Sequence, residues 1–232
     1  DTKKVSILDL LDSSDAIIKK FGEYVYEKVF VHYTAKQWNI PIEEVDTSVI
    51  NRVPVILGYD DRYFQDKYQF MPKNGYNEIF NNLLNHNNIE VKLNKDAKDF
   101  LEIKDNKIYV DGLEYNGEVI YSGALDELLN YQYGALPYRS LNLVFSDYKE
   151  NYYQPSSVVN YPNDEKFTRI TEFKYLSNQI VQDNTTILRE YPLTYDYKDK
   201  NHIPYYAILN DDNKKLYEKY FNLVKDIKNF HL

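Results

Sequence analysis

Four apolar runs within residues 141–191 decide the fold class: LNLVF at 141–145, SSVVNY at 156–161, FTRITEFKYL at 167–176 and TTILREY at 185–191. Each run is rich in β-branched and aromatic residues, and polar or turn-forming residues separate it from the next. Strands that come in succession favour an antiparallel sheet over a series of βαβ units. The sequence therefore predicts an α+β protein with a mainly antiparallel sheet.

Helical patterns lie on both sides of these runs. From Ser14 to Phe30 the apolar residues recur every three or four positions, with Ser13, Ser14 and Asp15 as candidate caps. Further helices are expected at 77–86, 124–131 and about 213–230. Residues 60–76 alternate aromatic and polar side chains as a strand would, and short strands are expected at 89–93, 107–110, 113–115 and 118–121.

Composition excludes several classes of function. The 232 residues carry a net charge of −8, and the sequence pI is near 5.1, so no basic face is available for nucleic acid. Cysteine is absent, which excludes a disulfide framework and a zinc-thiolate site and fits a cytoplasmic location. The four histidines are scattered, so we expect no metal site, and no apolar run is long enough to span a membrane.

Arginine is scarce and lies close to tyrosine or threonine. It occurs only at positions 52, 62, 139, 169 and 189 of a chain that otherwise uses lysine. A planar guanidinium recognises phosphate or carboxylate in a bidentate manner, which lysine cannot do. An arginine on the inner face of a strand needs a partner. Ion pairs with Glu172 and Glu190 or an anionic ligand such as a diphosphate would both satisfy that need.

The stretch FVHYTAKQW at 30–38 joins aromatic side chains to hydrogen-bond donors, and it contains the single tryptophan, Trp38. Stacking on an aromatic face contributes about 1–3 kcal/mol per nucleotide base, so the stretch could form a pocket for a base or a sugar ring. The competing interpretation is that these aromatic residues pack into the core at the end of a helix.

Several sequence blocks together resemble the UDP-galactopyranose mutase family, in the same order and over nearly the whole chain. The blocks are YTAKQW (33–38), NRVP (51–54), DDRYFQDKYQFMPKNGY (60–76), YSGALDELLNYQYGALPYRSL (121–141), VVNYP (158–162), FTRITEFK (167–174), REYP (189–192) and PYYAI (204–208). Differences from the family pattern occur at Asn39, Ile56 and Ala207.

The resemblance implies a flavoenzyme that interconverts UDP-galactopyranose and UDP-galactofuranose. In that family reduced FAD attacks the anomeric carbon through its N5 atom and expels UDP, which later returns to the ring-contracted sugar. By position in the motifs, Tyr33 would stack on the uracil, with Phe30 and Thr34 nearby, and Trp38 would form a wall of the cleft.

The resemblance also implies a set of residues at the diphosphate. Arg52 and Arg169 would hold it and stabilise the negative charge that grows as the glycosidic bond breaks. Tyr63 and either Tyr205 or Tyr206 would donate hydrogen bonds to the phosphates. Arg139 and Asn160 are further candidates for the same cleft, and a homodimer is a possible assembly.

The family's glycine-rich FAD fingerprint and its GRL…YxYxDM segment are not found among these 232 residues. No two of the seven glycines have the spacing of G-x-G-x-x-G. We therefore expect an internal portion of a mutase that is inactive by itself. The expected organisation is a helical substrate-binding region (1–58), a first part of the sheet region (59–76), part of the FAD-binding domain (77–138), the antiparallel sheet region (139–207) and a C-terminal helix (208–232).

Two other functions remain open at this point. One is a non-enzymatic module that binds UDP-sugars or glycans through an aromatic and arginine-lined cleft. The other is a different flavin enzyme that shares its architecture with the amine oxidases.

Overall fold

The computed structural model describes residues 3–38, 53–60, 62 and 64–232. The chain divides into two compact units. The first unit comprises Asp1–Leu83 and Arg139–Tyr205, and the second comprises Leu84–Tyr138 and Tyr206–Leu232. Each unit therefore consists of two segments that are distant in the sequence. No described helix is long and apolar enough to cross a membrane.

The first unit begins with a small helical part: β1 (Lys3–Val5), α1 (Ile7–Leu11), α2 (Ala16–Val25), the π-helix η1 (Tyr26–Val31) and α3 (His32–Trp38), followed by β2 (Val55–Leu57). The Asp15 carboxylate caps α2 by accepting hydrogen bonds from the amides of Ile17 and Ile18. Ile7, Leu10 and Phe30 form the core of this part. β1 and β2 pair in an antiparallel manner beside it.

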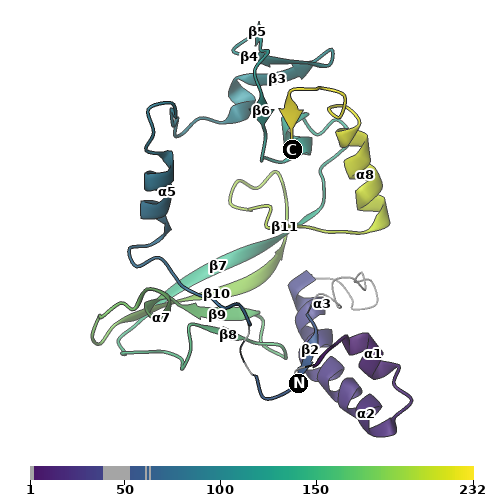
Figure 1. Cartoon of the computed structure of the whole chain (residues 1–232), viewed down its shortest axis with the longest axis vertical. Helices are drawn as coiled ribbons and strands as arrows, with labels where there is room; N and C mark the ends of the chain where they lie inside the picture. Colours follow the sequence, from purple (N-terminus) through teal and green to yellow (C-terminus); the bar gives the residue numbers. More distant parts are fainter. Residues whose placement is uncertain (1–2, 39–52, 61, 63) are drawn as a thin grey trace. The chain divides into compact units, whose positions relative to one another are not determined.

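An antiparallel sheet makes up the rest of the first unit. Its strands β7 (Tyr138–Tyr148), β10 (Thr185–Thr194), β9 (Arg169–Glu172) and β8 (Val158–Asn160) lie side by side in that order (Figure 1). Glu190 of β10 is opposite Leu143 of β7 on one side and Arg169 of β9 on the other. Because side chains alternate between the faces of a strand, Glu190, Leu143 and Arg169 share one face.

A buried carboxylate holds a loop against this sheet. Glu172 ends β9 with none of its surface exposed, and its oxygens accept hydrogen bonds from the amides of Tyr153 and Gln154 and from the hydroxyl of Thr185. The helix α7 (Phe173–Ser177) follows directly. Its Lys174 ammonium donates to the main-chain oxygens of Asn151, Val181 and Asn184, so loops on both sides of α7 are attached to it.

The second unit packs short elements around an apolar cluster. Its elements are η3 (Ala97–Asp99), β3 (Leu101–Lys104), β4 (Lys107–Val110), β5 (Leu113–Glu114), β6 (Val119–Ile120), α6 (Leu125–Leu128), β11 (Tyr206–Ala207), α8 (Asp211–Phe221) and β12 (Phe230–His231). Ile108, Leu125, Tyr220 and Val224 are buried in this cluster, and the Tyr220 hydroxyl donates to the Gly134 carbonyl at 2.6 Å. β3, β4 and β5 form an antiparallel sheet, whereas β6 and β12 are parallel.

The structure confirms the α+β class and the antiparallel sheet, with several local differences. The expected single helix from Ser14 to Phe30 is an α-helix that changes to a π-helix at Tyr26. Residues 167–176 divide into a strand and a helix at Phe173. No strand forms at residues 89–93 or in the described part of 60–75. The helix expected at 77–86 is α5 (Tyr76–Leu84), and the helix expected at about 213–230 is α8, which ends at Phe221.

Asp126 gives a test of the second unit's packing. It is 2% exposed, one carboxylate oxygen accepts from the Leu136 amide at 2.7 Å, and the other has no hydrogen-bond partner among the described residues. Burial raises the pKa of Asp126 above its ordinary value of 3.8. Its contribution to stability is therefore fully present below that value and is lost as the pH rises through the higher pKa of the folded state.

We expect Asp126→Asn to be stabilising relative to the wild type at pH 7 and to lose that advantage near pH 4, because the amide carries no charge to desolvate. Urea unfolding at a series of pH values measures the difference. The exposed Asp226→Asn in the same unit serves as the control and should show no such trend. A difference that stayed constant with pH would contradict the prediction.

Glu172→Gln tests the attachment of the loop in the first unit. The amide group would place a donor against the donating amides of Tyr153 and Gln154. We expect a loss of about 2–3 kcal/mol in the free energy of unfolding, because a buried donor is left unsatisfied. Urea unfolding with the exposed Glu150→Gln as control measures this effect, and equal stabilities of the two variants would refute it.

Candidate functional site

Arg169 is the centre of a polar cluster in the first unit. It begins β9, its Nε donates to Oδ1 of Asn160 at 3.2 Å, and its Nη1 lies 3.7 Å from Oε1 of Glu190. Tyr33 also lies close to the guanidinium, since it is one of the groups that raise the pKa of Arg169. Residues from one helix and three strands therefore meet at a single cation.

The electrostatics of this cluster favour a permanent positive charge. Burial is the largest influence on the pKa of Arg169 and acts to lower it. Glu190, Tyr33 and Tyr205 act in the opposite direction, and the net shift of the pKa is upward. The Arg169 side chain keeps about a third of its surface exposed, at 32%, whereas that of Glu190 keeps 13%. The guanidinium is therefore both charged and accessible.

The π-helix leads into the helix that carries Tyr33. Phe30 and Thr34, four positions apart on one helical face, are buried, and Phe30 packs with Ile7 and Leu10. Tyr33 lies beside that face, in the first turn of α3, and is partly exposed. Burial of Phe30 and Thr34 thus fixes the orientation of α3, and Tyr33 contacts Arg169 as a consequence.

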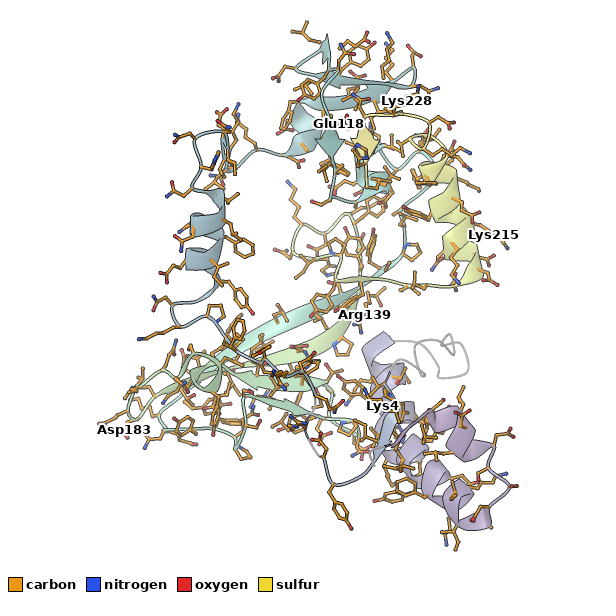
Figure 2. All side chains as sticks on the ribbon, viewed as in Figure 1. Lys4, Glu118, Arg139, Asp183, Lys215 and Lys228 are labelled. Atoms are coloured by element: carbon orange, nitrogen blue, oxygen red, sulfur yellow. The ribbon has the colours of Figure 1, made fainter. Side chains whose placement is uncertain are left out.

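A second arginine lies at the end of the sheet where β7 begins (Figure 2). Arg139 is 6% exposed, and its guanidinium lies 5.8 Å from the centre of the Tyr205 ring. The Tyr205 amide donates to the Arg139 carbonyl at 2.9 Å. The alternation of side chains along β7 and β10 places Arg139 on the same sheet face as Glu190 and Arg169.

Arg189 has a different environment. Its Nη2 donates to the hydroxyls of Tyr148 and Tyr153 at 3.0 and 2.9 Å, and its guanidinium lies within 6 Å of both of these rings and of the Phe167 ring. It is adjacent to Glu190 in β10 and therefore belongs to the opposite face of the sheet. Arg189 therefore donates to tyrosine hydroxyls and lies among aromatic rings, and it does not pair with a carboxylate of the described residues in the way that Arg169 does.

The structure thus brings together part of the predicted site. Asn160 accepts a hydrogen bond from Arg169, Tyr33 and Tyr205 lie near enough to raise the pKa of Arg169, and Arg139 adjoins Tyr205. Phe30 and Thr34 are buried, and Phe30 packs in the core of the helical part. Core packing was the competing interpretation for the aromatic residues of 30–38. Tyr206 falls in the second unit. Arg52, Tyr63 and the side chain of Trp38 lie outside the described residues.

One residue of the cluster, Glu190, was not among the predicted site residues. Glu190 was expected only as one possible partner for a buried arginine, and it pairs with Arg169. Glu172, the other expected partner, binds main-chain amides instead. Lys36, which adjoins the pocket-forming aromatics in the sequence, donates to four main-chain oxygens between Tyr161 and Phe167.

The chemistry available to the cluster is anion binding. An accessible guanidinium with neighbouring tyrosine hydroxyls and an amide can bind phosphate oxygens. Among the described residues, no group of three or more His, Asp or Glu side chains is placed to hold a metal ion.

The described residues do not by themselves fit FAD. Dinucleotide sites of the usual kind need a glycine-rich turn between a parallel strand and a helix. The parallel pair β6 and β12 has two residues in each strand, and the turn after β6 reads Tyr-Ser-Gly at 121–123. No step that involves a flavin can therefore be derived from these residues alone.

Comparisons of the sequence with known proteins find several sugar-nucleotide mutases. The family model described as UDP-galactopyranose mutase matches residues 28–232. A probable UDP-galactopyranose mutase from Klebsiella pneumoniae is 35% identical over 225 residues, which cover 97% of this chain and 55% of that protein. A dTDP-fucopyranose mutase from Escherichia coli is 34% identical over 228 residues, covering 97% of this chain and 58% of the relative.

A UDP-galactopyranose mutase from Mycoplasma genitalium is 33% identical over 232 residues, covering 98% of this chain and 57% of the relative. The chain thus spans somewhat more than half the length of the curated relatives that it matches. A match over most of the chain, at this level of identity and in the region that contains the Arg169 cluster, establishes the relationship. The chain belongs to the UDP-galactopyranose mutase family.

Proposed function

We propose that the protein containing this chain is a flavin-dependent mutase that interconverts UDP-galactopyranose and UDP-galactofuranose. The observation that carries the proposal is the convergence of Tyr33, Asn160 and Tyr205 on Arg169. These residues come from α3, β8 and the segment after β10, and their common neighbour is a charged, accessible guanidinium. Such a group suits the diphosphate of a nucleotide sugar.

Arg169 is proposed to bind the diphosphate through paired N–H donors, in exchange for part of its contact with Glu190. As the bond between the anomeric carbon and the phosphate oxygen breaks, negative charge grows on the diphosphate, and a fixed guanidinium stabilises it. Arg52, outside the described residues, is proposed to act with it. Arg169 would then hold UDP near the sugar until the new bond forms.

Tyr33 is proposed to stack on the uracil, while its hydroxyl stays close to Arg169. The ring face and the hydroxyl of a tyrosine are separate binding groups, so one side chain can serve both ends of the nucleotide. Tyr205, in the same unit as Arg169, is the better candidate than Tyr206 for a hydrogen bond to the phosphates. Asn160 and Arg139 would complete the polar lining.

The near-equal identity to a dTDP-fucopyranose mutase makes a dTDP-sugar the second candidate substrate. Uracil and thymine differ by one methyl group, which a hydrophobic contact distinguishes only weakly. Calorimetric titration of the whole protein with UDP and with dTDP separates the two candidates. Binding of neither nucleotide, with flavin retained, would favour a different flavin enzyme. Binding of UDP without flavin or turnover would favour a non-enzymatic module.

Arg169→Lys tests the proposed role at the diphosphate. We expect kcat/KM of the whole mutase to fall by about 10²-fold, because a point charge on a flexible stem cannot reproduce the bidentate contact. Arg189→Lys, on the opposite face of the sheet, is the matched control and should change kcat/KM little in the protein that remains folded. Unchanged kinetics in Arg169→Lys would remove Arg169 from catalysis.

The 232-residue chain by itself tests the assignment of the flavin. We expect a purified preparation to carry no flavin absorbance and to show no turnover of UDP-galactopyranose with added FAD and dithionite, since no glycine-rich dinucleotide turn is present. The whole mutase, treated in the same way, is the control. A yellow and active preparation of the chain would show that its own residues suffice.

A further inference from the structure

The ammonium of Lys36 lies within a ring of main-chain oxygens. Its Nζ donates to the carbonyls of Tyr161, Asn163, Glu165 and Phe167 at 2.6, 3.0, 2.8 and 3.1 Å. These four residues alternate along the connection between β8 and β9. A lysine has three N–H donors, so four acceptors at these distances engage all of them. No donor of Lys36 remains for a ligand.

The Lys36 ammonium supplies hydrogen-bond donors for the main-chain oxygens of the connection between β8 and β9. The connection points four alternate carbonyls at one ammonium, and main-chain oxygens that lose a partner without gaining another are costly. Burial lowers the pKa of Lys36, while the carboxylates of Glu165 and Asp164 act in the opposite direction. The connection therefore has one shape in which its oxygens converge, and that shape depends on a cation from another element.

The two partners in this contact carry the residues that meet at Arg169. Lys36 follows Tyr33 by three positions, about one turn along α3. The carbonyl ring begins one residue after Asn160 and ends two residues before Arg169. The Tyr161 amide donates to the Thr168 carbonyl at 2.9 Å, which closes the base of the connection. Lys36 is thus the direct link between the helix of Tyr33 and the loop flanked by Asn160 and Arg169.

We propose that Lys36 is a positioning residue for the nucleotide-sugar site, which joins α3 to the 161–167 connection and so fixes the position of Tyr33 relative to Asn160 and Arg169. The inference rests on the proposed function, because it takes Tyr33 to bind the base of the nucleotide and Arg169 to bind its diphosphate. Lys36 contacts no substrate atom in this role and acts only through the segments that it joins.

Lys174 provides a matched control within the same unit. It also donates to main-chain oxygens, those of Asn151, Val181 and Asn184, and it is 5% exposed. None of these partners is a candidate site residue. Lys174→Met therefore removes the same kind of contact as Lys36→Met without touching the loop that leads to Arg169.

The first experiment measures the affinity of the whole protein, with its cofactor, for UDP by calorimetric titration. Both variants should unfold at lower temperature than the wild type. Lys36→Met should weaken UDP binding about tenfold or more, as expected when binding groups are displaced, whereas Lys174→Met should leave the affinity unchanged. Equal affinities in all three proteins, or equal losses in the two variants, would overturn the proposal.

A chemical rescue keeps the test decisive if Lys36→Met is too unstable to purify. In Lys36→Ala, added ethylammonium can enter the carbonyl ring and donate as the lysine did, whereas tetramethylammonium has no N–H donor. Ethylammonium should restore several-fold of the lost UDP affinity, and tetramethylammonium should restore none. Failure of ethylammonium to restore any affinity would count against the proposal.

Hydrogen exchange separates failure of this inference from failure of the proposed function. Lys36→Met should accelerate exchange at the amides of residues 161–168 and in α3, and Lys174→Met should not. A wild-type protein that bound no UDP would contradict the proposed function, while the exchange pattern would still decide whether Lys36 joins the two segments. Unchanged exchange at 161–168 in Lys36→Met would overturn the positioning role outright.

Discussion

Charged side chains bound to main-chain groups hold the loops of the first unit in place. Glu172 accepts hydrogen bonds from amides of the loop before β8. Lys174 and Lys36 donate to carbonyls of that loop and of two further segments. In each loop several polar main-chain atoms converge on one point, and one charge satisfies them. A neutral side chain could serve fewer atoms at lower strength, so the loop conformations depend on these three residues.

The position of the candidate site follows from this arrangement. Arg169 begins β9 and Glu172 ends it, so a four-residue strand has its site residue at one end and its loop anchor at the other. α3 reaches the same place through the burial of Phe30 in the π-helix that precedes it and through the contact of its own Lys36. The segments that carry the cluster are thus each held by contacts outside it, so the cluster is preorganised for an anion.

The strand pattern of residues 141–191 predicted the fold class, because alternation and turn residues are local signals. Individual pairings could not be predicted: Glu190 was one of two possible partners for a buried arginine until the register placed it opposite Arg169. The grouping of Tyr33, Asn160 and Tyr205 came from family resemblance rather than from periodicity. Nothing in the sequence indicated the role of Lys36. Its acceptors are main-chain oxygens 125–131 positions away, and every residue has a main-chain oxygen.

The buried and half-buried cations of the first unit show two binding geometries. Lys36 and Lys174 each bind three or four carbonyls that converge from different directions, which suits a compact ammonium with freely rotating donors. Arg139 and Arg189 are placed against tyrosine rings, and Arg169 pairs with a carboxylate, where a planar group is required. Among these five side chains, the choice of cation therefore follows the shape of the partner. An arginine that keeps an accessible edge, as Arg169 does, is the member of this set suited to a second planar or tetrahedral anion.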